Sequence, residues 1–195
     1  MSGTFPTTGF TVMNFKSNTT TRITTTLSGK TLRQALPSQF FSFKLQSPPL
    51  TRAEFQPVMA FIMKQNGKFD SFTIIPPLVN DASGTAGGTI TVNATYAAGS
   101  STVKANGGTG TLKAGDMIKF SNHNKVYMVT ADVDMDASSV DTIEIFPSLR
   151  EAVSNTTTIQ YDDVPFEVFM TSDVMEYQVG STQLFTYEID VREEL

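Results

Sequence analysis

The sequence contains no cysteine and no tryptophan, and it contains a single histidine. Without cysteine the chain can form no disulfide, no thiolate nucleophile and no cysteine metal site. The one histidine, His123, cannot form a conventional zinc site alone. No G-x-S-x-G serine elbow occurs that could join it in a triad. These absences argue against the common forms of nucleophilic and metal catalysis.

Long apolar runs and basic stripes are also missing. No apolar segment approaches the roughly 20 residues that span a bilayer, so we expect no membrane partner. The segment "MSGTFPTTGF" has neither a basic region nor an apolar core, and we expect no secretory signal there. The net charge is −5 and the cations form no stripe, which argues against a nucleic-acid-gripping protein. The N-x-[ST] sequons at Asn18, Asn93 and Asn155 are interpreted as by-products of a threonine-rich sequence.

The pattern that is present is one of alternating strands. The 195 residues suit one domain or two small ones. "QLFTYEIDV" and "PFEVFMT" alternate apolar and polar residues, and they could form a hairpin that turns near Gly180. "RITTTL" and "FFSFKL" alternate in the same way. The residues predicted to share a face within each strand are Ile23, Thr25 and Leu27; Phe41, Phe43 and Leu45; Phe166, Val168 and Met170; and Phe185, Tyr187, Ile189 and Val191.

One segment, "PLTRAEFQPVMAFIMKQNGKF", has helical spacing instead. Thr51 and Glu54 form a capping box at its start, and Asn66–Gly67 supplies a left-handed stop. The pattern therefore predicts a helix near 51–66. Pro57 removes one backbone hydrogen bond, so we expect a kink or a later start. The predicted apolar face comprises Phe55, Val58, Met59 and Ile62.

The middle of the chain is small, polar and rich in glycine from Asn80 to Gly110. Short strands are predicted at 89–93 and 101–105. The glycine-rich segments 84–88 and 106–110 are expected to be loops that stay mobile until a neighbouring molecule orders them.

Prolines bracket this middle region and suggest its limits. Pro76 and Pro77 close the strand before it, and Pro165 precedes the return to long alternating strands. We therefore predict an inserted small β domain at 80–164 within an outer domain of 1–79 plus 165–195. The predicted fold class is mainly β: a β-sandwich with one packed α-helix and an inserted small β-barrel-like unit.

Candidate reactive residues gather in "AGDMIKFSNHNKVYMVTADVDMD". His123 lies in a predicted turn, "SNHN", and is expected to face solvent. Asp132, Asp134 and Asp136 begin like a calcium loop. Its sixth position, however, is Ala137 rather than glycine, and its twelfth is isoleucine rather than glutamate. A charged strand end explains these aspartates more simply.

Two further motifs fail on their spacing. The G-K-T at 29–31 lacks the earlier glycine of a phosphate-binding loop, because that position is Thr24. Glu144 and Asp162 are candidate acids of a glycosidase, but no spacing fixes them on one face. We therefore predict no catalytic, cofactor-binding or metal-binding residues, no cofactor and no enzymatic activity.

The same central segment resembles the insert of tailed-bacteriophage tail proteins in the distal tail and baseplate group. The shared features are Gly115–Asp116 before a strand, a second strand that runs into Val129–Asp132, and a third that ends at Pro147, Leu149 and Arg150. The predicted helix and the final "LFTYEIDVREEL" are similar to the outer parts of these tail-tube-like structural proteins.

The resemblance implies a structural virion protein of the tail or baseplate, assembled in the host cytoplasm. Such proteins form closed homo-oligomeric rings, commonly hexameric, by inter-subunit strand pairing around a channel, and they contact other tail or baseplate proteins. DNA passes through without sequence-specific binding. The strands expected to pair lie at 20–27, 38–45, 166–175 and 184–191. The alternative is a carbohydrate- or receptor-binding β-sandwich module on a tail tip or cell surface, which would need an exposed aromatic platform.

Overall fold

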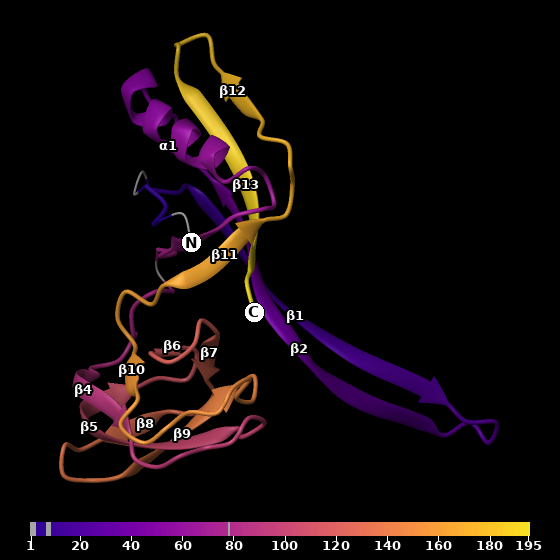
Figure 1. Cartoon of the computed structure of the whole chain (residues 1–195), viewed down its shortest axis with the longest axis vertical. Coiled ribbons are helices and arrows are strands. Elements are labelled where there is room, and N and C mark those ends of the chain that lie inside the picture. Colours follow the sequence, from indigo (N-terminus) through magenta and orange to yellow (C-terminus); the bar gives the residue numbers. More distant parts are fainter. Residues whose placement is uncertain (1–2, 7–8, 78) are drawn as a thin grey trace.

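A computed structural model of the chain describes residues 3–6, 9–77 and 79–195. The predicted outer domain also includes positions 1, 2, 7, 8 and 78, which lie outside the described residues. The fold is mainly β, with 48% of residues in strands and a single helix in the described part of the chain. Figure 1 shows a sheet that carries the helix, a barrel, and a long two-stranded arm. The predicted fold class is confirmed.

The first sheet joins the two ends of the chain. Its order is β1-β2-β13-β11-β3, and β12 also pairs with β13. All of these pairs are antiparallel. The bounds are β1 (Val12–Thr25), β2 (Thr31–Gln46), β3 (Ser71–Ile74), β11 (Phe166–Met170), β12 (Tyr177–Val179) and β13 (Phe185–Glu193).

This order corrects the expectation that 166–175 and 184–191 offer free edges. β11 and β13 each have a hydrogen-bonded strand on both sides. They are therefore interior strands of the sheet, and their alternating residues pack from its middle. The turn near Gly180 joins β12 to β13, while β11 pairs with the far end of β13. The outermost strands are β1, β3 and β12.

Most of the predicted faces are confirmed. The buried residues from β2, β11 and β13 are Phe41, Phe43 and Leu45; Phe166, Val168 and Met170; and Tyr187, Ile189 and Val191. Phe185 is partly buried against the same core. Ile23 and Thr25 share a face of β1 as predicted, but both are exposed, and Leu27 lies in the turn after β1 instead of on that face.

The helix α1 (Arg52–Lys64) covers the first sheet. Its capping box is confirmed: the Glu54 carboxylate accepts hydrogen bonds from the Thr51 N–H at 2.9 Å and hydroxyl at 2.8 Å. Asn66 and Gly67 have φ values of 53° and 67°, as the predicted stop requires. The helix begins at Arg52 and continues through Pro57, so a later start is wrong. Burial of its apolar face, Phe55, Val58 and Ile62, holds it there.

The described residues hold no helix with the length and apolarity needed to cross a membrane.

The middle of the chain forms a closed barrel. Six strands pair in the order β4-β10-β6-β7-β9-β5, and β5 pairs back with β4, while β8 pairs with β5. Closure removes free edges and surrounds a separate apolar core. The bounds are β4 (Gly87–Val92), β5 (Thr102–Leu112), β6 (Met117–Phe120), β7 (Val126–Val129), β8 (Val133–Met135), β9 (Asp141–Phe146) and β10 (Thr158–Gln160).

The prediction of a mobile loop at 106–110 is wrong, because these residues lie within β5, and the loop predicted at 84–88 is wrong at Gly87 and Gly88, which begin β4. β5 pairs with β4 on one side and with β8 and β9 on the other. Its glycines permit close backbone approach. Gly110 has a φ of 73°, and a Cβ there would collide with the carbonyl oxygen of Thr85. Glycine in a strand marks such approaches and bulges as well as loops.

We expect Gly110→Ala to lower the free energy of unfolding by about 1–3 kcal/mol, because it adds a steric clash to an unfavourable φ. Gly99→Ala is the matched control, because Gly99 has a φ of 92° but no atom within 4 Å of the added Cβ. Denaturant titration should show a larger loss for Gly110→Ala. Equal losses would contradict the role of the close approach.

Candidate assembly surfaces

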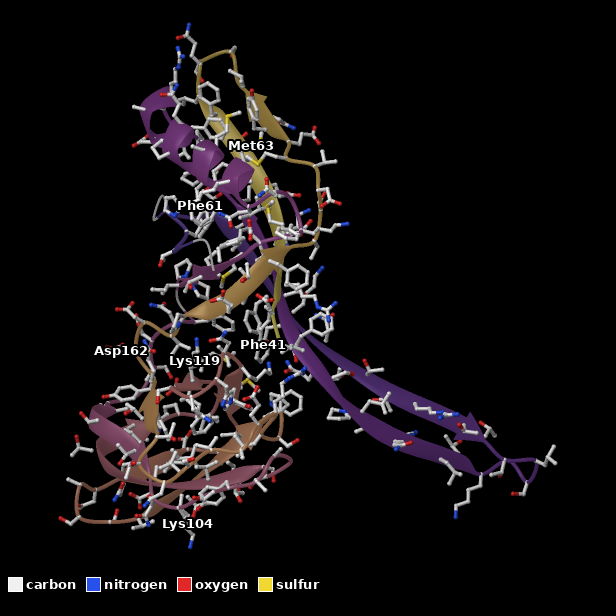
Figure 2. All side chains as sticks on the ribbon, viewed as in Figure 1. Phe41, Phe61, Met63, Lys104, Lys119 and Asp162 are labelled. Atoms are coloured by element: carbon white, nitrogen blue, oxygen red, sulfur yellow. The ribbon has the colours of Figure 1, made fainter. Side chains whose placement is uncertain are left out.

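A buried ion pair joins the barrel to the first sheet. Nζ of Lys125, just before β7, lies 2.6 Å from Oε2 of Glu193 at the end of β13, and the side chains are 2% and 0% exposed. Glu193 also accepts hydrogen bonds from the backbone N–H of Val126 at 2.9 Å and of Phe41 at 3.0 Å. The carboxylate of Glu193 therefore connects its own strand, β13, to β2 and to the barrel. Figure 2 shows Phe41 at the level where the arm, the sheet and the barrel meet.

The carboxylate of Glu193 supports the charged form of the buried Lys125 ammonium. Burial lowers the pKa of Lys125, and Glu193 acts against that shift. The Nζ atom also lies 4.4 Å from the centre of the Phe41 ring. Met117 and Val126 of the barrel strands belong to the core of the first sheet. The barrel is therefore held by both charge pairing and apolar contact.

The arm is the projecting part of the β1–β2 hairpin, residues 17–38. Its strands pair from Thr20↔Leu36 to Thr25↔Thr31 and have no other strand partner in the described chain. Figure 1 shows it extending away from the sheet and the barrel. Ile23 is 62% exposed and Leu32 is 50% exposed, on opposite faces. Because an isolated two-stranded hairpin is marginally stable in water, the arm has the features of a surface that another chain covers.

The arm also differs from the rest of the chain in charge. No aspartate or glutamate precedes Glu54, so all 19 acidic residues lie outside the arm. The arm itself carries Arg22, Lys30 and Arg33. Sequence reasoning missed this asymmetry because net charge averages it away, although a count by segment would have found it. The same reasoning missed Glu193, for which no local pattern gives a signal.

His123 lies in the predicted turn, but the expectation that it faces solvent is wrong. The residue is 9% exposed. Its Nε2 lies 2.8 Å from the hydroxyl of Tyr127, and its Nδ1 lies 3.0 Å from the amide oxygen of Asn122. Burial lowers the pKa of His123 and raises the pKa of Tyr127 to about 12. The Tyr127 hydroxyl also accepts a hydrogen bond from the Arg150 N–H at 3.0 Å. His123 therefore ties the turn to the barrel core.

Asp132, Asp134 and Asp136 each bind a different group. Asp132 binds Nζ of Lys113 at 2.7 Å, and Asp134 accepts a hydrogen bond from the Thr111 hydroxyl at 2.7 Å. Asp136 accepts one from the Ser138 N–H at 2.8 Å, within its own turn. Within residues 3–6, 9–77 and 79–195, no group of three or more His, Cys, Asp or Glu side chains could hold a metal ion.

Asp116, from the Gly115–Asp116 motif, has a structural role. It is 4% exposed. Its carboxylate accepts hydrogen bonds from the backbone N–H of Ser83 at 2.8 Å and of Lys113 at 2.7 Å. The residue therefore fixes the segment before β4 against the loop before β6.

The other candidate residues are not brought together. Glu144 lies on β9 and Asp162 follows β10, and two strands separate β9 from β10 in either direction around the barrel. The G-K-T motif lies at the tip of the arm. The exposed large aromatics in the described part of the chain are Phe69 and Tyr177, which come from separate elements.

Together these features define a mainly β structural protein in which polar residues stabilise the fold and an uncovered arm remains. Residues 79–164 match the family described as "Distal tail protein pb9, B domain". No curated protein sequence matches the chain. The barrel segment is therefore similar to the B domain of distal tail proteins, which supports a place for the chain among phage distal tail proteins, structural proteins of the virion tail.

We expect Glu193→Gln to lower the free energy of unfolding by about 3–5 kcal/mol, because it leaves the Lys125 ammonium buried without a counter-charge. The double variant Lys125→Met with Glu193→Gln should recover most of this loss in chemical denaturation. The control is Asp132→Asn, which breaks an exposed pair and should have a much smaller effect. A Glu193→Gln loss as small as the control's would contradict the proposed importance of the junction.

The protein should lose stability on mild acidification through His123. Its folded pKa lies below the ordinary value of 6.5, so between the two values the unfolded chain binds more protons than the folded one. The contribution is complete above the unfolded pKa and is lost as pH falls through the folded pKa. In His123→Gln, unfolding measured between pH 8 and 5 should depend less on pH. An unchanged pH dependence would contradict this assignment.

Proposed function

We propose that this protein is a structural component of a bacteriophage tail or baseplate that forms a closed ring around the DNA channel by inter-subunit strand pairing. The family match supports a structural tail role. A hexameric ring, contacts with other tail or baseplate proteins and assembly in the host cytoplasm are part of the same proposal. The role requires no reaction and no cofactor.

The arm is the single observation that supports the proposed ring. Within it, β2 pairs only with β1 among residues 3–6, 9–77 and 79–195, and its other edge presents backbone N–H and C=O groups that no described strand pairs. An edge of this kind is a template for a strand from another chain. A contact between two different surfaces of identical subunits gives a ring when the rotation closes. The pairing strands are therefore proposed as β1 and the arm part of β2, instead of β11 and β13.

The two compact units suit different parts of this role. We propose that 1–79 plus 165–195 is the ring-forming domain and that the inserted domain 80–164 contacts other tail or baseplate proteins. From Glu54 onward the chain is strongly acidic. A channel lined by such a surface would let DNA pass without specific binding, because it offers phosphates no counterion-releasing contacts.

Shortening the arm should abolish the ring and leave the fold intact. Replacing residues 21–35 with Asn-Gly joins the cross-strand pair Thr20 and Leu36 through a two-residue turn. Because the removed residues contribute nothing to either apolar core, the unfolding temperature should stay nearly unchanged. Mass photometry and negative-stain images should show rings for the full chain and monomers for the shortened one. Rings from the shortened chain would refute the role of the arm.

A further inference from the structure

A groove with acidic walls lies beside β12, at the end of the first sheet farthest from the barrel. Its cavity volume is about 380 Å³, within the size range of pockets that hold a ligand. The apolar lining includes Val174, Met175 and Tyr177, and the carboxylates include Glu176 and Asp190. Val174 is 76% exposed. The groove therefore combines an uncovered apolar surface with negative charge.

Part of this negative charge has no ion-pair partner among the residues that the structure describes. Lys44 pairs with Glu188 on the groove wall at 2.5 Å, and Asp190 lies within its electrostatic reach. Glu176 takes part in none of the ion pairs of the described residues. An occupant that supplies a cation and an apolar side chain would complement the groove.

The tip of the arm has this chemistry. Leu27, in the turn, is fully exposed, and Lys30 lies three residues later. The arm adds Arg22 and Arg33 and carries no acidic residue. Gly29, with a φ of 81°, keeps the turn tight and free of a side chain. A basic, apolar tip and an acidic, apolar groove are therefore present on the same chain.

The tip cannot occupy the groove of its own copy. Figure 1 shows the arm and β12 pointing toward different ends of the molecule. The six cross-strand pairs from Thr20↔Leu36 to Thr25↔Thr31 extend about 20 Å at 3.3 Å per residue, enough to cross a subunit boundary. We infer that the arm tip of one copy docks in the groove beside β12 of the next copy, with Leu27 on the apolar lining and Lys30 beside Glu176. The inference rests on the proposed ring, to which it assigns the receiving surface.

The absence of native cysteine allows a direct test by cross-linking. A variant with both Leu27→Cys and Val174→Cys should give a ladder of disulfide-linked oligomers on oxidation, because docked residues come within about 7 Å between Cα atoms. The control pairs Leu27→Cys with Lys104→Cys, at the far end of the barrel in Figure 2, and should give no ladder.

A second test reverses the charges of the proposed contact residues and measures self-association. Lys30→Glu alone and Glu176→Lys alone should each weaken self-association by about tenfold at low salt, and the double variant should restore it. Lys104→Glu, the charge-matched control, should leave association unchanged. Rings that form without the Leu27–Val174 cross-link, or cross-links of the tip only to another tail protein, would overturn this inference while the ring stands. A chain that forms no rings, even with tail partners present, would overturn the proposed function as well.

Discussion

The buried carboxylate of Glu193 is the constraint on which the arrangement of the molecule depends. A charge removed from water must be paired and hydrogen-bonded, and Glu193 meets this requirement with Lys125 and with the N–H groups of Val126 and Phe41. These partners come from the barrel and from the base of the arm. One side chain at the end of β13 therefore links the barrel to the base of the arm, and the apolar contacts of Met117 and Val126 hold the barrel beside it.

From that point the arm leaves the sheet, and no other strand in the described part of the chain pairs with it. At residues 42–46, β2 forms backbone hydrogen bonds with β1 on one side and with β13 on the other. In the arm, β2 pairs with β1 alone among the described strands. The arm also concentrates positive charge, while all acidic residues lie later in the chain. Every copy of a homo-oligomer would thus carry both members of a complementary pair. In the proposed ring these two different surfaces would meet head to tail, a contact that gives a ring when the rotation closes.

The polar residues with the most suggestive chemistry all have structural roles. Asp116 fixes two loops of the barrel, and His123 joins a turn to Tyr127. The three neighbouring aspartates bind separate groups on the barrel surface. The segment that carries these contacts is the one that matches the distal tail B-domain family. We therefore interpret its motifs as determinants of the barrel fold.

Local features of the fold could be predicted from the sequence. Alternation at Phe41–Leu45, at β11 and in β13 predicted the buried faces, because side chains in a strand change sides with a period of two. Thr51 and Glu54 predicted the start of the helix because a capping box is a contact between near neighbours. The folded arrangement of distant segments makes 106–110 a strand, buries His123 and places β11 and β13 in the interior of the sheet. It also decided the pairing of Lys125 with Glu193, since these residues are 68 positions apart and no sequence period connects them.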